Sequence, residues 1–170
     1  MACRLAEFSE GLKKQSPTAQ SIQALFPKLE VFKFLLSEDY ELIEPYRFRY
    51  QYEAGKYVLK EGTHGAYMFF IVDGEAEVSQ LVKENKVFVA KLGTGRSLGE
   101  MSLLDGKARS ASVKAISDLT LIVLKRKDFQ RLLADHPQTA SRVVIGIASL
   151  LSASLRDTTR VFSEQTLSLC

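Results

Sequence analysis

The segment GEMSLLDGKARSAS at residues 99–112 combines residue types that can bind a phosphate and a hydroxyl group together. Gly99 lets the backbone approach a ligand closely, and the amide N–H groups that follow it can donate hydrogen bonds to an anion. Ten residues later, Arg109 offers a planar guanidinium that can pair with a phosphate through two hydrogen bonds. Glu100 would repel a phosphate, so its presence favours a ligand that also carries a hydroxyl group, such as a sugar phosphate.

Two interpretations of this segment stay open on the sequence pattern alone. Ser110 and Ala111 are small enough for a phosphate to lie against the chain, and they add one hydroxyl group and two amides as donors. Alternatively, residues 105–106 (Asp-Gly) form an ordinary hairpin turn, and Arg109 makes an exposed ion pair with the glutamate that contributes little to stability.

Turn residues divide the chain into a β-rich middle and two helical ends. The four prolines stand at positions 17, 27, 45 and 137, and eight of the ten glycines lie between the last two prolines. Glycine turns at short intervals between β-prone runs are typical of a compact all-β unit. We expect strands at 47–52, 67–72, 75–82, 86–92, 110–115 and 119–124. The pattern predicts about seven or eight short strands, enough for a roll or a sandwich.

Helices are expected on both sides of the β region. The spacing of apolar residues predicts helices over 18–26 and 37–43, a short amphipathic helix over 127–134, and a long helix from Pro137 to about residue 162. Gly146 weakens the long helix by about 1 kcal/mol relative to alanine. One side of this helix forms a packing seam, made by Val144, Ile147, Leu151, Ser154, Thr158 and Val161.

The composition offers little for catalysis, and we predict that the chain is not an enzyme. The two histidines, His64 and His136, cannot build a multi-histidine metal site, and the two cysteines, Cys3 and Cys170, have no metal-binding spacing. No nucleophile elbow is present, so we assign no catalytic residue, metal ligand or catalytic cofactor. The net charge of +3 is too small to indicate nucleic acid or membrane binding.

The sequence predicts a cytoplasmic protein that does not interact with a membrane. No apolar run approaches the length of about 20 residues that spans a bilayer, and the N-terminus lacks the apolar core of a signal peptide. Nucleic acid binding through the basic residues from Lys125 to Arg131 is a weaker alternative, since such a run is usually a solvated surface.

Residues 99–112 closely resemble the phosphate-binding cassette of cyclic-nucleotide-binding domains. This family includes bacterial catabolite activator proteins, regulatory subunits of protein kinase A and cyclic-nucleotide-gated channels. The resemblance extends from about residue 35 to 160, because residues 52–78 are similar to the early strands of the family and their turn glycines. The cassette positions that match are Gly99, Glu100, Met101, Leu103, Leu104, Arg109, Ser110 and Ala111. Leu98 departs from the family, which usually has an aromatic residue there.

The resemblance implies a fold and a division of the chain. The expected fold is mainly β, an eight-stranded β-roll of the double-stranded β-helix or jelly-roll type, with N-terminal helices and a long C-terminal helix. It implies an N-terminal helical segment at 1–45, a cyclic-nucleotide-binding β-roll at 46–126 that contains the cassette at 98–112, and C-terminal hinge and lid helices at 127–170. We expect a stand-alone domain without a DNA-binding domain.

The resemblance also implies the roles of the cassette residues. Glu100 would accept a hydrogen bond from the ribose 2′-hydroxyl group, and Arg109 would pair with the cyclic phosphate. Gly99 would allow the backbone to approach the phosphate closely. The anion site would be completed by the amides of Met101, Ser102, Ser110 and Ala111. The ligand would be cAMP or cGMP. Ser110 does not decide between the two bases, since catabolite activators also have serine there while binding cAMP. Of the two ligands, we favour cAMP.

The lid is expected to come from the C-terminal helix. Ser154 falls where activator proteins place a hydroxyl group against adenine, although it could equally be a small residue that eases helix packing. Arg156 is a weaker candidate for stacking on the base. The apolar seam of this helix could pack on its own roll or on a second chain, so a homodimer is possible.

We expect the chain to signal by a change of conformation. Ligand binding would pull the cassette inward and move the 127–134 helix and the C-terminal helix, which an unidentified protein partner or an oligomer would sense. Two alternatives are an interaction scaffold that keeps the fold without binding a nucleotide, and a sensor of another cyclic mononucleotide or dinucleotide.

Overall fold

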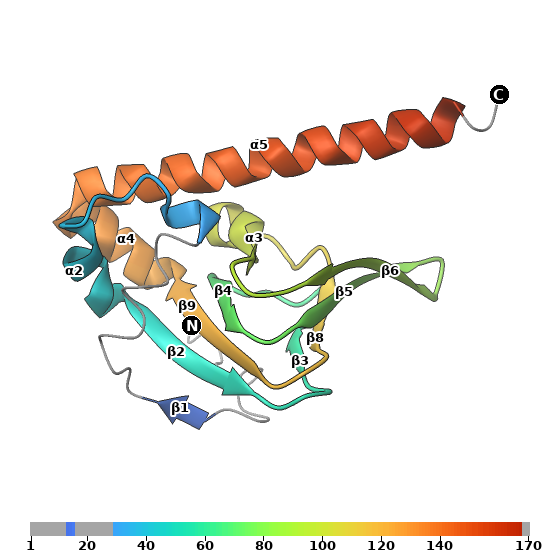
Figure 1. Cartoon of the computed structure of the whole chain (residues 1–170), viewed down its shortest axis with the longest axis horizontal. Helices are drawn as coiled ribbons and strands as arrows, with labels where there is room; N and C mark the ends of the chain where they lie inside the picture. The colour runs from blue at the N-terminus through green and yellow to red at the C-terminus, as the bar shows by residue number, and fades with distance from the viewer. Residues whose placement is uncertain (1–12, 16–28, 168–170) are drawn as a thin grey trace.

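The computed structural model describes residues 13–15 and 29–167 of the chain. Two antiparallel sheets form a β-roll with helices packed on its outside and one long helix across its top (Figure 1). The predicted mainly-β fold with a long C-terminal helix is therefore confirmed. The helix predicted over 18–26 lies outside the described residues.

The strands agree with the predicted runs to within two residues. In spatial order the first sheet contains β1 (Lys13–Gln15), β2 (Arg47–Tyr52), β9 (Leu119–Lys125), β4 (Tyr67–Asp73) and β7 (Ser97–Leu98). The second contains β3 (Tyr57–Leu59), β8 (Ser112–Ala115), β5 (Ala76–Val82) and β6 (Asn85–Leu92). The strands that the pattern did not delimit, β1, β3 and β7, are only two or three residues long.

Strand β4 forms a wall between two hydrophobic clusters. Its residues Met68, Phe69, Phe70 and Ile71 are all 0% exposed, as expected for a continuously apolar strand. Because successive side chains point to opposite faces of a strand, Met68 and Phe70 join the helix-side cluster, whereas Phe69 and Ile71 join the cluster inside the roll. Strand β9 divides its side chains between the same two clusters.

The described helices lie where the sequence predicts them, but several begin or end at different residues from those predicted. The short elements before the roll are the 3₁₀ turn η3 (Glu30–Phe32), the helix α2 (Asp39–Ile43) and the 3₁₀ turn η4 (Glu44–Tyr46). Within the roll, α3 (Glu100–Asp105) precedes β8, and α4 (Arg126–Asp135) follows β9. The C-terminal helix α5 (Pro137–Leu167) continues five residues beyond the predicted end near residue 162.

The first half of α5 is part of the core, and its second half is not. Ala140, Val143 and Ile147 are 0% exposed and pack in the helix-side cluster. Gly146 is required for this packing, because a Cβ atom there would overlap with the carbonyl group of Val31 in η3. From Ser152 to Glu164 every residue of α5 is exposed, and Figure 1 shows this part running above β5 and β6.

Helix α5 also corrects the expectation that no segment is long and apolar enough to cross a membrane. Its residues Pro137–Glu164, a stretch of 28, pass that test by length and composition, and an 18-residue window within them has a mean hydropathy of 1.2. A helix that packs in a core passes the same test, and the first half of α5 is such a helix.

A buried polar network joins α2 to α5. The carboxylate of Asp39, which is 1% exposed, accepts hydrogen bonds from the Thr139 hydroxyl group at 2.6 Å and from the Arg142 guanidinium at 2.9 Å. The amide of Leu36 donates to the same carboxylate at 2.7 Å. A second bond, from the Tyr46 hydroxyl group to Asp135 at 2.7 Å, ties η4 to the end of α4. The short N-terminal elements therefore anchor both C-terminal helices.

Candidate functional site

The cassette begins with a short helix that has a left-handed residue at each end. Gly99, before α3, has φ +82°, and Gly106, after it, has φ +71°, a conformation that glycine adopts without steric cost. The Gly106 amide donates to the Ser102 carbonyl oxygen at 3.1 Å, which closes the last turn of α3. Asp105 accepts a hydrogen bond from the Lys107 amide at 2.9 Å. Residues 105–106 therefore end a helix, and the alternative of a simple hairpin turn is wrong.

Arg109 is folded into the site instead of lying on the surface. The residue is 4% exposed, and its guanidinium donates to the carbonyl oxygens of Tyr67 at 2.7 Å and Gly99 at 3.3 Å. The guanidinium carbon lies 4.4 Å from the centre of the Tyr67 ring, within the range of a cation–π contact. The alternative of an exposed Arg109–Glu100 ion pair is therefore also wrong.

Two glycines make room for this guanidinium. A Cβ atom at Gly99 would lie 2.5 Å from Nη1 of Arg109, and one at Gly65 would lie 2.7 Å from Nη2. The sequence pattern indicated Gly99 but not the roles of Gly65 and Tyr67. The sequence does contain a signal for these roles: Tyr67, an aromatic residue with a hydroxyl group, begins an apolar strand, and Gly65 stands two positions before it.

The loop before β4 holds the backbone of the arginine. The Arg109 amide donates to the Thr63 carbonyl oxygen at 2.8 Å, and the Gly62 amide donates to the Arg109 carbonyl oxygen at 2.9 Å. His64 forms an isolated β-bridge with Ala108 in the same place. The arginine is thus fixed at both its backbone and its side chain by segments more than 40 residues away in the sequence.

Glu100 lies close enough to Arg109 for the two charges to interact. Burial raises the pKa of the Glu100 carboxyl group above its ordinary value of 4.5, while its own backbone amide and the charge of Arg109 act in the opposite direction. The fold therefore brings the predicted glutamate and arginine to one place, at the start of α3.

The other cassette residues differ in exposure. Ser102 is buried at 4% exposure, whereas the Met101 side chain is 52% exposed. Ser110 is exposed, and its carbonyl oxygen accepts a hydrogen bond at 2.9 Å from the side-chain amide of Gln80 in β5. Ala111 is partly buried against the cluster inside the roll.

The two residues expected in the lid lie apart from the cassette. Ser154 and Arg156 are exposed on the second half of α5. The Arg156 guanidinium donates to the Ser152 hydroxyl group of its own helix at 2.7 Å. Within the described part of the chain, no hydrogen bond or ion pair links either residue to the cassette.

The cassette helix contacts the C-terminal helices through its buried side and its last turn. Leu103 is 1% exposed and lies in one cluster with Phe129 of α4 and Ile147 of α5. The Arg126 guanidinium, at the start of α4, donates to the Leu104 carbonyl oxygen at the end of α3. The sequence pattern missed this role of Arg126.

Known proteins with similar sequences bind cyclic nucleotides according to their names. The chain is 33% identical over 129 residues to the cyclic AMP receptor protein of Thermus thermophilus, a match that covers 75% of the chain and 57% of the receptor. It is 37% identical over 90 residues to a cyclic nucleotide-gated potassium channel of Rhizobium etli, covering 53% of the chain and 24% of the channel. The chain therefore spans less than two thirds of these relatives.

The similarity to solved structures covers nearly the whole chain. A cyclic nucleotide-binding domain from Methylobacillus flagellatus has a TM-score of 0.83 at 26% identity, covering 96% of this chain and 97% of that one. The catabolite activator protein of Thermus thermophilus has a TM-score of 0.72 at 30% identity, covering 81% of this chain and 63% of that one. The sequence profile of the cyclic nucleotide-binding domain matches residues 49–136, which include most of the roll, the cassette and α4. The chain belongs to the cyclic nucleotide-binding domain family.

Proposed function

We propose that this chain is a cytoplasmic sensor that binds cAMP and transmits the binding event through its C-terminal helices. The observation that carries the proposal is the meeting of Glu100 and Arg109 at the start of α3, next to a glycine that leaves no room for a side chain. A carboxylate and a guanidinium held side by side suit a ligand that presents a hydroxyl group and a phosphate together. The proposed function is binding without catalysis.

In the proposed complex, Glu100 accepts the ribose 2′-hydroxyl group and Arg109 pairs with the cyclic phosphate. The phosphate competes with the carbonyl oxygens of Tyr67 and Gly99 for the guanidinium. A charged acceptor forms a stronger hydrogen bond than a neutral carbonyl group. The anion site is completed by the amides of Met101, Ser102, Ser110 and Ala111.

One observation supports cAMP over cGMP, namely the similarity to a cyclic AMP receptor protein. Ser110 is exposed beside the arginine and does not decide between the two bases. A sequence 33% identical over 113 residues belongs to a cGMP-dependent protein kinase of Caenorhabditis elegans, so cGMP is the ligand to test against cAMP.

The proposed signal runs from α3 to α5 through direct contacts. Movement of α3 toward a bound phosphate shifts Leu103 within the cluster that it shares with α4 and α5. The same movement pulls on α4 through the bond from Arg126 to Leu104. Since packed clusters respond by changing between discrete arrangements, residues 127–170 act as the hinge and lid of the binding unit at 46–126.

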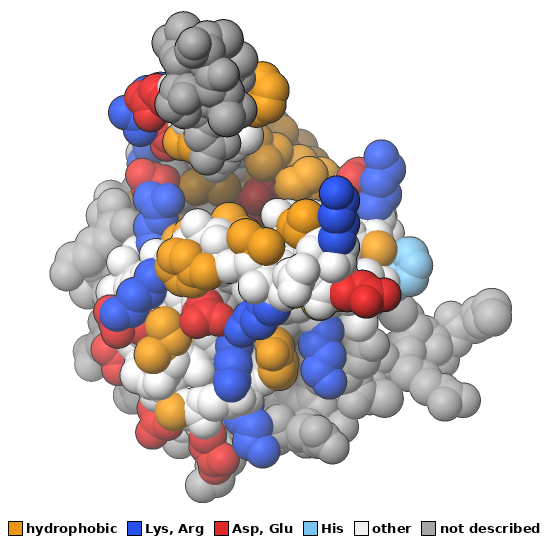
Figure 2. All heavy atoms as spheres, turned by 90° about the vertical axis from the view of Figure 1, so that its right-hand side faces the viewer, with side chains coloured by type: hydrophobic (Ala, Val, Ile, Leu, Met, Phe, Trp, Pro, Cys, Tyr) orange, Lys and Arg blue, Asp and Glu red, His pale blue; other side chains and the backbone are white. Residues whose placement is uncertain are grey.

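The exposed part of α5 favours a second chain as the element that senses this movement. Leu155, Val161 and Phe162 are 68%, 46% and 70% exposed, an unusual number of apolar side chains for a helix in water. Figure 2 looks at the molecule from the C-terminal end of α5 and shows apolar side chains gathered on the surface beneath the helix. We therefore propose a homodimer through α5. In this dimer, Ser154 and Arg156 face a nucleotide bound by their own chain or by the partner chain.

The decisive experiment is calorimetric titration of the purified, ligand-free chain with cAMP and with cGMP. Glu100→Gln and Arg109→Lys remove the proposed carboxylate and the two-pronged guanidinium, while Lys107→Gln removes an exposed cation of the same loop as a matched control. We expect saturable binding of one nucleotide per chain, weaker by about tenfold or more in the first two variants and unchanged in the third. Thermal unfolding of each variant without ligand checks that the fold is intact.

Absence of heat and of a thermal shift with either nucleotide would overturn the proposal. The chain would then be a scaffold that keeps the fold, or a sensor of another cyclic nucleotide, which a titration with cyclic dinucleotides distinguishes. The dimer is tested by sedimentation of the chain and of Phe162→Asp, and a monomeric parent chain at 100 μM would contradict it.

A further inference from the structure

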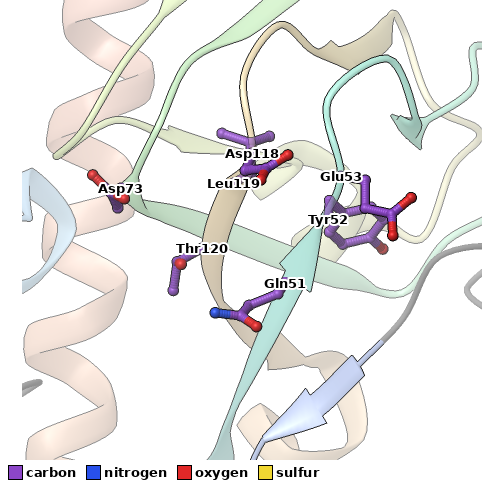
Figure 3. Close-up of a pocket in the computed structure, with 7 residues that line it drawn as sticks. All are labelled: Gln51, Tyr52, Glu53, Asp73, Asp118, Leu119 and Thr120. Carbon is purple, nitrogen blue, oxygen red and sulfur yellow. The ribbon is translucent and has the colours of Figure 1, made fainter.

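The cassette residues account for the sugar and the phosphate of the proposed ligand, but none of them distinguishes adenine from guanine. The pocket drawn in Figure 3, with a volume of about 340 Å³, does not supply the missing contact. Strand β4 runs from Tyr67 at the cassette to Asp73 at this pocket, so the two places lie at opposite ends of the strand. The pocket residues Glu53, Asp73 and Asp118 are exposed, and their carboxylates would repel a phosphate. A residue that contacts the base must therefore lie beside the cassette.

Gln80 of β5 lies beside the cassette, on the face of the strand that lines the inside of the roll. Alternate residues of a strand share a face, and Ala76 and Val78 of the same row belong to the cluster inside the roll. Both are buried, whereas Gln80 is exposed. The side-chain nitrogen of Gln80 lies 2.9 Å from the carbonyl oxygen of Ser110, the residue after Arg109. Gln80 is thus the first polar residue of its row, at the point where the core ends and the cassette begins.

Glu61 holds the strand of this glutamine against the end of the cassette. The Glu61 carboxylate accepts a hydrogen bond at 2.8 Å from the amide of Leu81, the residue after Gln80. The Glu61 amide donates at 3.0 Å to the hydroxyl group of Ser112, the last residue of the cassette. The position of Gln80 is therefore fixed through its backbone neighbour as well as through its side chain.

The bond to Ser110 also fixes which way the Gln80 carboxamide points. A backbone carbonyl oxygen only accepts hydrogen bonds, so the nitrogen of the carboxamide, and not its oxygen, must face Ser110. The carboxamide oxygen makes no hydrogen bond to any residue that the structure describes. It is therefore an acceptor of fixed orientation at the edge of the proposed nucleotide site.

An acceptor of fixed orientation discriminates between the two purine bases. At position 6 of the purine ring, adenine carries an amino group that donates a hydrogen bond, whereas guanine carries an oxygen that accepts one. The Gln80 oxygen would bond to the amino group and would repel the guanine oxygen. In nucleic acid recognition, glutamine is typical of contacts with adenine, and arginine or lysine of contacts with guanine.

We propose that Gln80 selects adenine over guanine in the nucleotide site. Its oxygen accepts a hydrogen bond from the 6-amino group of adenine, while its nitrogen keeps the bond to Ser110. Val87 of β6 pairs with Gln80 and is 44% exposed, so it offers an apolar contact for the ring. This inference rests on the proposed function, because it requires a nucleotide held by Glu100 and Arg109.

The test is a calorimetric titration of the full chain with cAMP, cGMP and cyclic inosine monophosphate. The inosine nucleotide differs from cAMP only at position 6, where it carries an oxygen, and at the adjoining ring nitrogen. Gln80→Leu removes the acceptor with little change in size, and Gln80→Arg replaces it with donors that suit an oxygen at position 6. Gln130→Leu makes the same replacement at an exposed glutamine of α4 and is the matched control. Thermal unfolding without ligand checks that each variant is folded.

The measured quantity is the ratio of two affinities within each variant, so a general weakening of the cassette cancels. We expect the parent chain and Gln130→Leu to bind cAMP about tenfold or more tightly than the inosine nucleotide. The ratio should fall to about one in Gln80→Leu and should reverse in Gln80→Arg.

Equal affinity of the parent chain for cAMP and the inosine nucleotide would overturn the inference, and so would an unchanged ratio in Gln80→Leu. An equal loss of preference in Gln130→Leu would show that the effect is not specific to Gln80 and would overturn it as well. If the parent chain binds none of the three nucleotides, the proposed function fails and this inference fails with it. Binding of all three with the same affinity contradicts the inference alone.

Discussion

Replacing Gly99 with alanine tests whether the cassette depends on the close approach of the Arg109 guanidinium. The new Cβ atom would lie 2.5 Å from Nη1 of Arg109 and 2.9 Å from the Tyr67 carbonyl oxygen. The guanidinium can move away, but the Tyr67 carbonyl group belongs to the backbone of a buried strand. We therefore expect Gly99→Ala to displace the arginine and to strain the start of α3.

The structure offers controls that separate the two costs of this substitution. Gly55 has φ +84°, almost the same as Gly99, but a Cβ atom there would meet nothing within 4 Å. Gly55→Ala therefore has only the cost of a left-handed backbone, about 1–2 kcal/mol. Gly65→Ala is the complementary control, because its Cβ atom would lie 2.7 Å from Nη2 of Arg109 without a positive φ. In Gly99→Ala the steric overlap adds about 1–3 kcal/mol to the backbone cost.

Thermal unfolding and calorimetric titration with cAMP measure the two consequences. We expect Gly99→Ala to be less stable than Gly55→Ala, with a difference in melting temperature of about 2–4 °C for each kcal/mol in a chain of this size. Nucleotide affinity should fall at least about tenfold in Gly99→Ala and in Gly65→Ala, because both displace the guanidinium. It should be unchanged in Gly55→Ala. Equal stability and equal affinity for Gly99→Ala and Gly55→Ala would refute the reasoning.

Three further predictions concern the charged groups around the helices. Asp39→Asn should lower the free energy of unfolding, measured in urea, by about 2 kcal/mol. Burial alone raises the Asp39 pKa, but hydrogen bonds from Thr139 and Leu36 and the charge of Arg142 lower the pKa below 3.8. The stabilisation by Asp39 is therefore present at neutral pH and is lost as the pH falls through that lowered value. Burial raises the Glu100 pKa above 4.5, so cAMP affinity should weaken as the pH falls through this raised value, and calorimetry on Glu100→Gln should show a flat profile. Arg126→Gln should retain cAMP binding, but hydrogen exchange should show a smaller ligand-induced change in α4 and α5 than in the parent chain.

The positions of the strands and of the cassette follow from local sequence. The continuous apolar run at 67–72 predicts a strand buried on both faces, and Met68 to Ile71 are indeed fully buried. The spacing of Gly99 and Arg109 predicts one site because the intervening residues form a single short helix with a glycine at each end. Such features depend on neighbours a few residues apart, and the sequence pattern records them directly.

The partners of the arginine could not be predicted in this way. The carbonyl group of Tyr67 comes from a strand 42 residues before Arg109, and a backbone acceptor leaves no trace in the identity of the residue. Gly146 is a similar case. By propensity it only weakens α5, but its contact with the Val31 carbonyl group shows that helix packing, and not flexibility, requires glycine there.

The wall formed by β4 and β9 determines how the molecule unfolds. Since each strand supplies side chains to both hydrophobic clusters, neither cluster can lose its packing while the other stays intact. The roll and the helices on its outside therefore form one cooperative unit with a single unfolding transition. The part of α5 beyond Leu151 has no such connection, so its amide hydrogens should exchange with solvent by local opening while the rest of the chain remains folded.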